Sequence, residues 1–278
     1  MNISDSAKRE KNVAGLQCFS SRIVENKNRG IDLLTAFFMV ALQFCLTPSS
    51  MAGPPPPTDD PGILDPGAWE VIAAIVGEDR AADKVIQAPL LDVSLGVSAN
   101  TQLSFVLPRL VVDPEGAGTA KGLAFASVGY KWRFASTDQW EWAIAANYTL
   151  PVSHQVFRNN GPEDVRVLGL PVLVAYTHGE WTWLGQAGWN STSDGTHFWD
   201  YGLAASHPLG NSALWMVEVH GNAGSSFSES TLNYQFGLDY EVSPAFHVLA
   251  AAGSRIKSLP DPDARLNYSY FIGLQWFH

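Results

Sequence analysis

Ionisable residues recur two positions apart in several apolar stretches of this chain. Lys131 and Arg133 form one such pair, Asp239 and Glu241 form another, and Glu141 opens a further stretch. Because successive side chains of a β-strand point to opposite faces, each pair would lie on one face of a strand. Carboxylate, ammonium and guanidinium groups gathered on one surface either neutralise one another as ion pairs or bind a charged solute. The spacing alone is compatible with both kinds of chemistry.

Catalysis by a nucleophile or a metal ion has weaker support. No GxSxG or HExxH motif occurs, and the seven histidines are scattered singly, without the spacing of metal ligands. One stretch offers His197, Asp200, Ser206 and His207, but an extended strand would place Asp200 and Ser206 about 20 Å apart. The sequence therefore predicts no enzyme, no cofactor and no metal site.

From Trp69 onward, apolar and polar side chains alternate with period two in the stretches that carry these residues. No helical stripe of comparable length is present. In residues 140–150, for example, large apolar side chains alternate with Glu141 and small or polar residues. Such stretches have about the nine to eleven residues, or slightly more, that a tilted strand needs to cross a bilayer. About twelve can be counted: residues 69–77, 85–97, 101–110, 122–134, 140–150, 166–176, 181–190, 197–206, 213–221, 230–242, 245–253 and 267–276.

The distribution of charge over the two strand faces separates a membrane barrel from a soluble sandwich. A soluble sheet puts charges on its outward face, whereas here the face rich in Trp and Tyr carries none. Short connections also alternate with longer polar ones, namely residues 78–84, 111–121, 151–165, 191–196, 222–229 and 254–266. The sequence therefore predicts an all-β fold, a transmembrane antiparallel up-and-down β-barrel of about 12 strands, with its apolar face toward lipid.

In such a barrel the charged face would line the lumen. Eight strands pack their interior and sixteen leave a channel, so about twelve permit either paired charges that fill the lumen or a charged path for a solute. The lumen-lining candidates are Asp92, Lys131, Arg133, Glu141, Asp200, Glu218, His220, Asp239 and Glu241. On the opposite face, Trp132, Trp140 and Trp142 flank one short turn and are predicted to belong to an aromatic girdle at the membrane surface.

The two ends of the chain suggest export and assembly. Residues 1–52 are predicted to be an N-terminal extension and a cleaved signal peptide, because basic residues precede an apolar run and a small-x-small pattern at Ser50 and Ala52. Residues 53–67 form a Pro-rich leader, and residues 68–278 the barrel. The final strand resembles the signal read by the barrel-assembly machinery, with in-phase residues Tyr270, Ile272, Leu274, Trp276 and His278.

Several stretches resemble a family of bacterial outer-membrane proteins labelled as transporters of the MetA pathway of phenol degradation. They are "DPGAWEV", "PLLDVSLGVSANTQLSFVLP", "GLAFASVGYKWRF", "WLGQAGW" and "WMVEVHGNA". The resemblance lies in their order and spacing, and it covers nearly all of the chain after the predicted signal. It implies a barrel of the twelve-stranded type with a transport role, and it carries over no catalytic residues.

The sequence thus predicts a transporter or channel for small solutes, hydrophobic or aromatic ones among them, in the outer membrane of a Gram-negative bacterium. Expected partners are outer-membrane lipid, the barrel-assembly machinery and a small-molecule solute. Without residues 1–52 the chain keeps 11 Lys and Arg against 23 Asp and Glu, and such an acidic protein repels nucleic acid. The alternatives are a non-conducting structural or surface-binding barrel and, with least support, a barrel enzyme.

Overall fold

The computed structural model describes residues 57–278 apart from residues 115–117, 153–164, 228 and 258–264. The predicted signal peptide and the first residues of the Pro-rich leader lie outside the described residues. Within the described part no helix is long and apolar enough to cross a membrane.

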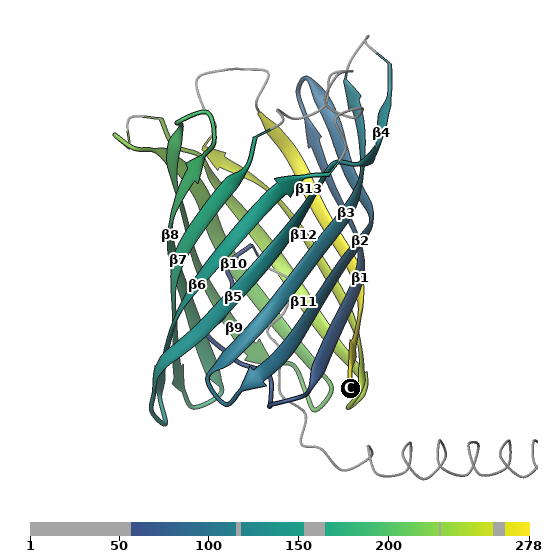
Figure 1. The fold of residues 1–278 in the computed structure, drawn as a ribbon. Coiled ribbons are helices and arrows are strands. Elements are labelled where there is room, and N and C mark those ends of the chain that lie inside the picture. Colours follow the sequence, from purple (N-terminus) through teal and green to yellow (C-terminus); the bar gives the residue numbers. More distant parts are fainter. Residues whose placement is uncertain (1–56, 115–117, 153–164, 228, 258–264) are drawn as a thin grey trace, which may run out of the picture. The chain divides into compact units, whose positions relative to one another are not determined.

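Twelve strands of 12 to 16 residues and one short strand make up a single antiparallel sheet, confirming the predicted fold class (Figure 1). The short strand β4 lies beside β3 just ahead of β5; it begins in the predicted loop 111–121 and ends in the stretch predicted as one strand, residues 122–134. The strands are β1 (Trp69–Arg80), β2 (Asp83–Ser98), β3 (Thr101–Pro114), β4 (Ala120–Leu123), β5 (Phe125–Ser136), β6 (Trp140–Pro151), β7 (Val167–His178), β8 (Trp181–Thr192), β9 (His197–Pro208), β10 (Ala213–Gly224), β11 (Leu232–Ser243), β12 (Phe246–Lys257) and β13 (Leu266–Phe277).

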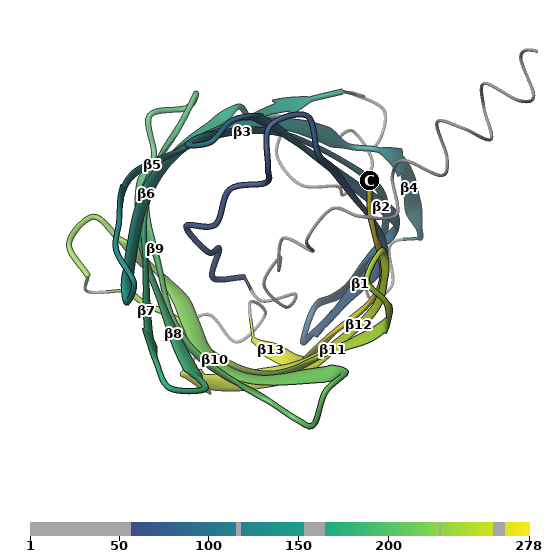
Figure 2. The same cartoon turned by 90° about the horizontal axis from the view of Figure 1, so that it is seen from below.

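The sheet closes on itself between β1 and β13. These strands pair antiparallel, with Val71 opposite Trp276. Trp69 and His278 exchange two backbone hydrogen bonds of 2.8 Å at the end of this seam. Viewed along its axis, the sheet is a closed ring (Figure 2), so the long strands leave no unpaired edge for another chain to join.

Apolar side chains lie on the outside of this ring and many polar ones lie within it. Val128 and Trp132 are about half exposed, at 50% and 47%, whereas Glu218 is 1% exposed and Gln275 is fully buried. A small apolar cluster also faces inward, formed by Ala175, Leu184, Ala204 and Met216. The exterior is therefore suited to lipid and the interior to water and polar groups.

Two predicted loops, residues 78–84 and 111–121, are shorter in the structure because the strands continue into them. Only two residues separate β1 from β2, and β3 extends to Pro114. Lys84 lies opposite Asp79 with Nζ 3.3 Å from Oδ2, so cross-strand polar contacts support the extension. The apolar pattern, which sets the predicted boundaries, ends before the hydrogen-bond ladder does.

Residues 57–68, called here the N-terminal segment, lie inside the ring ahead of β1 (Figure 2). The segment contains no strand or helix, as its prolines led us to expect. Its position within the lumen was not predicted. Pro61 is fully buried, and Leu64 is 4% exposed, so the segment packs against the wall along part of its length.

Candidate functional site

Thr58 attaches the N-terminal segment to the lumen wall at β10, far along the sequence from β1, into which the segment leads. Glu218 Oε1, on β10, accepts a hydrogen bond of 2.7 Å from the backbone N–H of Thr58 and a second one from its hydroxyl. Both residues are almost completely buried. A Cβ added at Gly202 on β9 would lie only 1.9 Å from Thr58 Oγ1. The missing side chain at Gly202 therefore makes room for this contact.

The middle of the segment contacts β8 and β5. The backbone N–H of Asp59 donates to Gln186 Oε1 at 2.8 Å. Lys131 Nζ lies 2.8 Å from Asp59 Oδ1 and donates to the carbonyl oxygen of Asp60 at 2.7 Å. Lys131 is thus held by the segment and is already neutralised.

The end of the segment that leads into β1 is held by β2 and β3. The backbone N–H of Leu64 donates to Gln102 Oε1 at 3.0 Å, and that of Gly67 donates to the carbonyl of Gly96 at 2.8 Å. A Cβ at Gly96 would lie 2.1 Å from the carbonyl oxygen of Asp65. A lumen wall without side chains at Gly96 and Gly202 therefore accommodates the segment at both ends.

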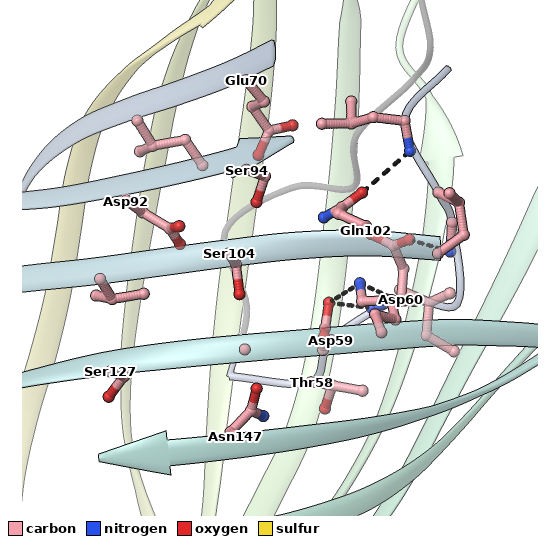
Figure 3. A pocket seen from close by; sticks show the side chains of 18 of the residues that line it. Thr58, Asp59, Asp60, Glu70, Asp92, Ser94, Gln102, Ser104, Ser127 and Asn147 are labelled. Carbon is pink, nitrogen blue, oxygen red and sulfur yellow. Dashed lines mark hydrogen bonds and ion pairs between the residues drawn. The ribbon is translucent and has the colours of Figure 1, made fainter. Parts of the chain in front are cut away.

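A cavity of about 640 Å³ lies between the segment and the barrel wall (Figure 3). Its size is in the range of small-molecule sites. The segment contributes Thr58, Asp59 and Asp60, which Figure 3 shows opposite polar side chains of the wall. The polar wall residues include Glu70, Asp92, Ser94, Gln102, Ser104, Ser127 and Asn147, and the apolar ones are Ile72, Leu90, Val106, Leu184, Leu249 and Phe271.

Four of the charged residues that line the cavity form ion pairs. Besides the pair of Lys131 with Asp59, Arg133 Nη1 lies 2.8 Å from Glu141 Oε1. Arg133 Nη2 also donates to the carbonyl of Ala99 at 3.0 Å. We call Asp59, Lys131, Arg133 and Glu141 the paired charges. For Lys131, Arg133 and Glu141 the structure shows the ion pairing that the sequence left as one of two alternatives, with Asp59 as a partner that the sequence did not indicate.

Two further carboxylates, Glu70 and Asp92, are arranged differently and are called here the unpaired carboxylates. Neither forms an ion pair with any residue of the described chain. Glu70 Oε2 accepts a hydrogen bond of 3.1 Å from Gln275 Nε2, whereas Asp92 Oδ1 is buried and has no hydrogen-bond partner. Both line the cavity.

The other predicted lumen residues lie away from this cavity. Asp200 accepts hydrogen bonds from Gln186 and Asn190, and Asp239 Oδ1 lies 2.8 Å from His247 Nδ1. Glu218 holds the N-terminal segment, His220 is half-buried two positions further along β10, and Glu241 is half-buried opposite His247. The structure thus brings four of the nine candidates to the cavity: Asp92, Lys131, Arg133 and Glu141.

The aromatic and C-terminal candidates lie on the outer surface. Trp132, Trp140 and Trp142 are all exposed, and the rings of Trp140 and Trp142 stack with centroids 6.1 Å apart. Their place at a membrane surface stays a prediction. In β13, Ile272, Leu274 and Trp276 are exposed and Tyr270 is half-buried. The His278 ring lies beside that of Trp276, with centroids 5.4 Å apart and the planes tilted by 34°. The role of these residues in assembly also stays a prediction.

Sequence reasoning missed Thr58, Asp59, Asp60, Glu70 and Gln102. The segment residues have no periodicity, and their wall partners are up to 160 positions distant. The one available signal was glycine at the lumen-facing positions Gly96 and Gly202, because a glycine within a strand often marks the close approach of another backbone.

Comparison with known proteins gives the fold and no family. No protein-family model matches the chain, and no curated protein is similar to it in sequence. Solved structures are similar. The COG4313 outer membrane channel from Pseudomonas putida F1 has a TM-score of 0.63 at 11% identity, over 77% of this chain and 97% of that one.

Two porins are also similar in structure. The NanC porin has a TM-score of 0.53 at 11% identity, over 75% of this chain and 98% of its own. The KdgM porin has a TM-score of 0.51 at 9% identity, over 74% of this chain and 98% of its own. At these identities the likeness shows the fold alone, which is that of outer-membrane channel and porin barrels. The barrel and its apolar exterior both point to the outer membrane.

Proposed function

We propose that this protein is an outer-membrane channel for small solutes whose path follows the cavity beside the N-terminal segment. The observation that carries the proposal is the segment itself. It occupies the lumen of a closed barrel, yet it leaves a cavity of about 640 Å³ lined by polar and apolar side chains. A barrel with a purely structural role would be expected to pack this space with side chains, as eight-stranded barrels do.

The lining of the cavity also indicates a class of solute. The apolar residues Ile72, Leu90 and Phe271 along the cavity suit a solute with a hydrophobic or aromatic body, in line with the resemblance to transporters of phenol degradation. The proposal also includes export by a cleaved signal peptide from residues 1–52, recognition of β13 by the assembly machinery, and a Gram-negative source. The hydrogen bonds at Thr58 favour the alternative of a non-conducting barrel, because they fix the segment in the lumen.

One reversible cross-link separates these alternatives. A Cβ placed at Gly202 lies 3.1 Å from Thr58 Cβ, near the separation of about 3.5–4.5 Å that a disulfide spans. The Thr58→Cys/Gly202→Cys variant, with Cys18 and Cys45 replaced by serine, would fix the segment under oxidising conditions and release it under reducing ones. The single Thr58→Cys variant controls for effects of the oxidant.

Liposome swelling and planar-bilayer conductance provide the readout. We expect flux of small solutes in the reduced protein, and flux restricted to the smallest solutes once the segment is fixed. Absence of flux in both states would reject the channel and favour the structural barrel.

A further inference from the structure

The unpaired carboxylates give the cavity a charge preference that the proposed function does not by itself specify. Five carboxylates line the cavity, against the two cations Lys131 and Arg133. Both cations are already bonded to carboxylates and to backbone carbonyl oxygens. The cavity therefore has an excess of negative charge, carried by Asp60, Glu70 and Asp92. Asp60 already accepts a hydrogen bond of 2.5 Å from the backbone N–H of Gly62, so we consider Glu70 and Asp92 as the groups open to a ligand.

Glu70 and Asp92 are close enough to act on one ligand group. Glu70 on β1 lies opposite Ser94 on β2, and Asp92 precedes Ser94 by two positions. Such diagonal neighbours on one face of an antiparallel pair are about 7–8 Å apart. Figure 3 shows both carboxylates directed toward the space between the wall and the N-terminal segment. A single donor group placed between them contacts both.

The surroundings of Asp92 indicate which chemical group of a ligand would suit the site. The Oδ1 atom of Asp92 is buried, so it does not itself face the cavity, and it has no hydrogen-bond partner among the described residues. A carboxylate that the protein leaves short of donors is destabilising, and the rest of the Asp92 side chain lines the cavity. An ammonium group carries three N–H donors and the opposite charge. Anions are disfavoured here because they would add to the negative charge, and a neutral solute would leave that charge uncompensated.

The apolar neighbours of the two carboxylates select against a bare metal ion. Ile72 lies opposite Asp92, and Val106 faces it from the other side. Hard cations such as Ca²⁺ take six or more oxygen ligands, and among the described residues no group of three or more His, Cys, Asp or Glu side chains could hold a metal. The apolar residues instead suit the hydrocarbon part of an organic cation.

We propose that Glu70 and Asp92 form a binding site for small organic ammonium ions, with the ammonium between the carboxylates and the hydrocarbon body against Ile72 and Leu90. The polar hydroxyls of Ser94 and Ser104, in the same row as Glu70, offer further contacts to a substituted amine. This inference rests on the proposed function, since it names the solute class that the cavity prefers. Equilibrium binding tests it independently of conduction.

The test compares three ligands of one shape: 4-fluorobenzylamine, 4-fluorobenzyl alcohol and 4-fluorobenzoate. Binding to the refolded barrel in detergent micelles is followed by fluorine NMR at low ionic strength. We expect the amine to bind at least tenfold more tightly than the alcohol, and the benzoate not to bind. Equal binding of amine and alcohol would overturn the proposal, as would displacement of the amine by K⁺ at an equal concentration.

Variants then assign the site. Asp92→Asn and Glu70→Gln should each weaken amine binding about tenfold and leave the affinity for the alcohol unchanged. Asp200→Asn removes the same charge from a lumen carboxylate that is already bonded to Gln186 and Asn190, so it should have little effect. An equal loss in all three variants would show a general charge effect and reject the site. Heat-modifiability on a gel confirms that each variant is folded.

Failure of this inference differs from failure of the channel. A barrel that conducts but binds amine and alcohol equally keeps the proposed function and loses the ammonium site. A barrel that binds the amine but conducts no solute keeps the site and loses the channel.

Discussion

The paired charges and the unpaired carboxylates line one cavity but differ in what surrounds them. Lys131 and Arg133 each contact a carboxylate at 2.8 Å and a backbone carbonyl oxygen at 2.7 and 3.0 Å. Asp92, by contrast, has a buried oxygen that receives no hydrogen bond from the part of the chain that the structure describes, and Glu70 receives one hydrogen bond from an uncharged amide. The inner face of the sheet thus carries charges that are paired with an opposite charge and charges that are not. Pairing does not satisfy every polar atom, since Arg133 Nε is also buried without a hydrogen-bond partner among the described residues.

This difference distinguishes lumen charges that stabilise the fold from lumen charges that are candidates for binding a ligand. Paired charges hold the N-terminal segment and the ends of strands, so they contribute to stability. An unpaired buried carboxylate lowers stability, and residues that do so are candidates for binding because function is the common reason for retaining them. The comparison predicts opposite signs for substitutions in the two groups.

The largest effect is expected for Lys131→Met. The change removes the hydrogen bonds of Nζ to Asp59 and to the carbonyl of Asp60. We expect a loss of about 1.5–3 kcal/mol in the free energy of unfolding, the range for a hydrogen bond to a charged group. The loss should not exceed this range, because Asp59 is partly exposed and water can solvate the carboxylate that is left unpaired. Guanidinium titration in lipid vesicles, followed by Trp fluorescence, measures it.

Lys84→Met provides the matched control for that loss. The Lys84 side chain is 63% exposed in its ion pair with Asp79, and such surface pairs contribute about 0–1 kcal/mol. Equal destabilisation by both substitutions would contradict the structural role assigned to Lys131.

Asp92→Asn should act in the opposite direction. The amide removes an unpaired negative charge while keeping the shape of the side chain, so we expect the free energy of unfolding to rise by about 1 kcal/mol, at the low end of the cost of an unsatisfied buried group. The same titration measures the change. A clear destabilisation would show that Asp92 is satisfied in solution and would remove the distinction between the two groups.

Ion selectivity should depend more on the unpaired carboxylates than on the paired ones. The acidic lumen predicts a preference for cations over anions, measured as the reversal potential across a KCl gradient. Asp92→Asn with Glu70→Gln should reduce that preference about twofold or more, whereas Glu141→Gln should change it less. The preference should fade with salt, since the Debye length falls to about 3 Å at 1 M. Anion selectivity of the unmodified protein would contradict the charge assignment.

The smallest effect is expected for Glu141→Gln on stability. Arg133 keeps its hydrogen bond to the carbonyl of Ala99, and both side chains of the pair are partly exposed, at 22% and 32%. The change in the free energy of unfolding should stay below about 1 kcal/mol. A loss as large as that of Lys131→Met would mean that this pair, too, is essential to the fold.

The barrel could be predicted from the sequence because its signal is local. Alternation along each strand records which side chains face lipid, and Trp132 or Val128 shows this without knowledge of any distant residue. The predicted positions of the strand ends are less accurate than the strands themselves, because polar residues such as Asp79 and Lys84 continue the hydrogen-bond ladder beyond the apolar band.

The cavity could be predicted only in part, since it depends on contacts between distant positions. Lys131 and Asp92 were recognised from their strand face. The pairing of Lys131 with Asp59, and the attachment of Thr58 to Glu218, join a segment without periodicity to strands far along the chain. No local pattern in the Pro-rich leader indicates that it lies within the barrel.

The seam between β1 and β13 also constrains the order of folding. It pairs Glu70 with Phe277, partners from the two ends of the barrel sequence, whereas each hairpin joins strands that are neighbours in the sequence. Contacts between distant residues carry the larger loop-closure entropy, so this seam is expected to form last. The N-terminal segment runs directly into β1, and its enclosure is therefore coupled to closure of the ring. A chain that closes with the segment outside would have to reopen this seam or thread the segment through one mouth of the barrel.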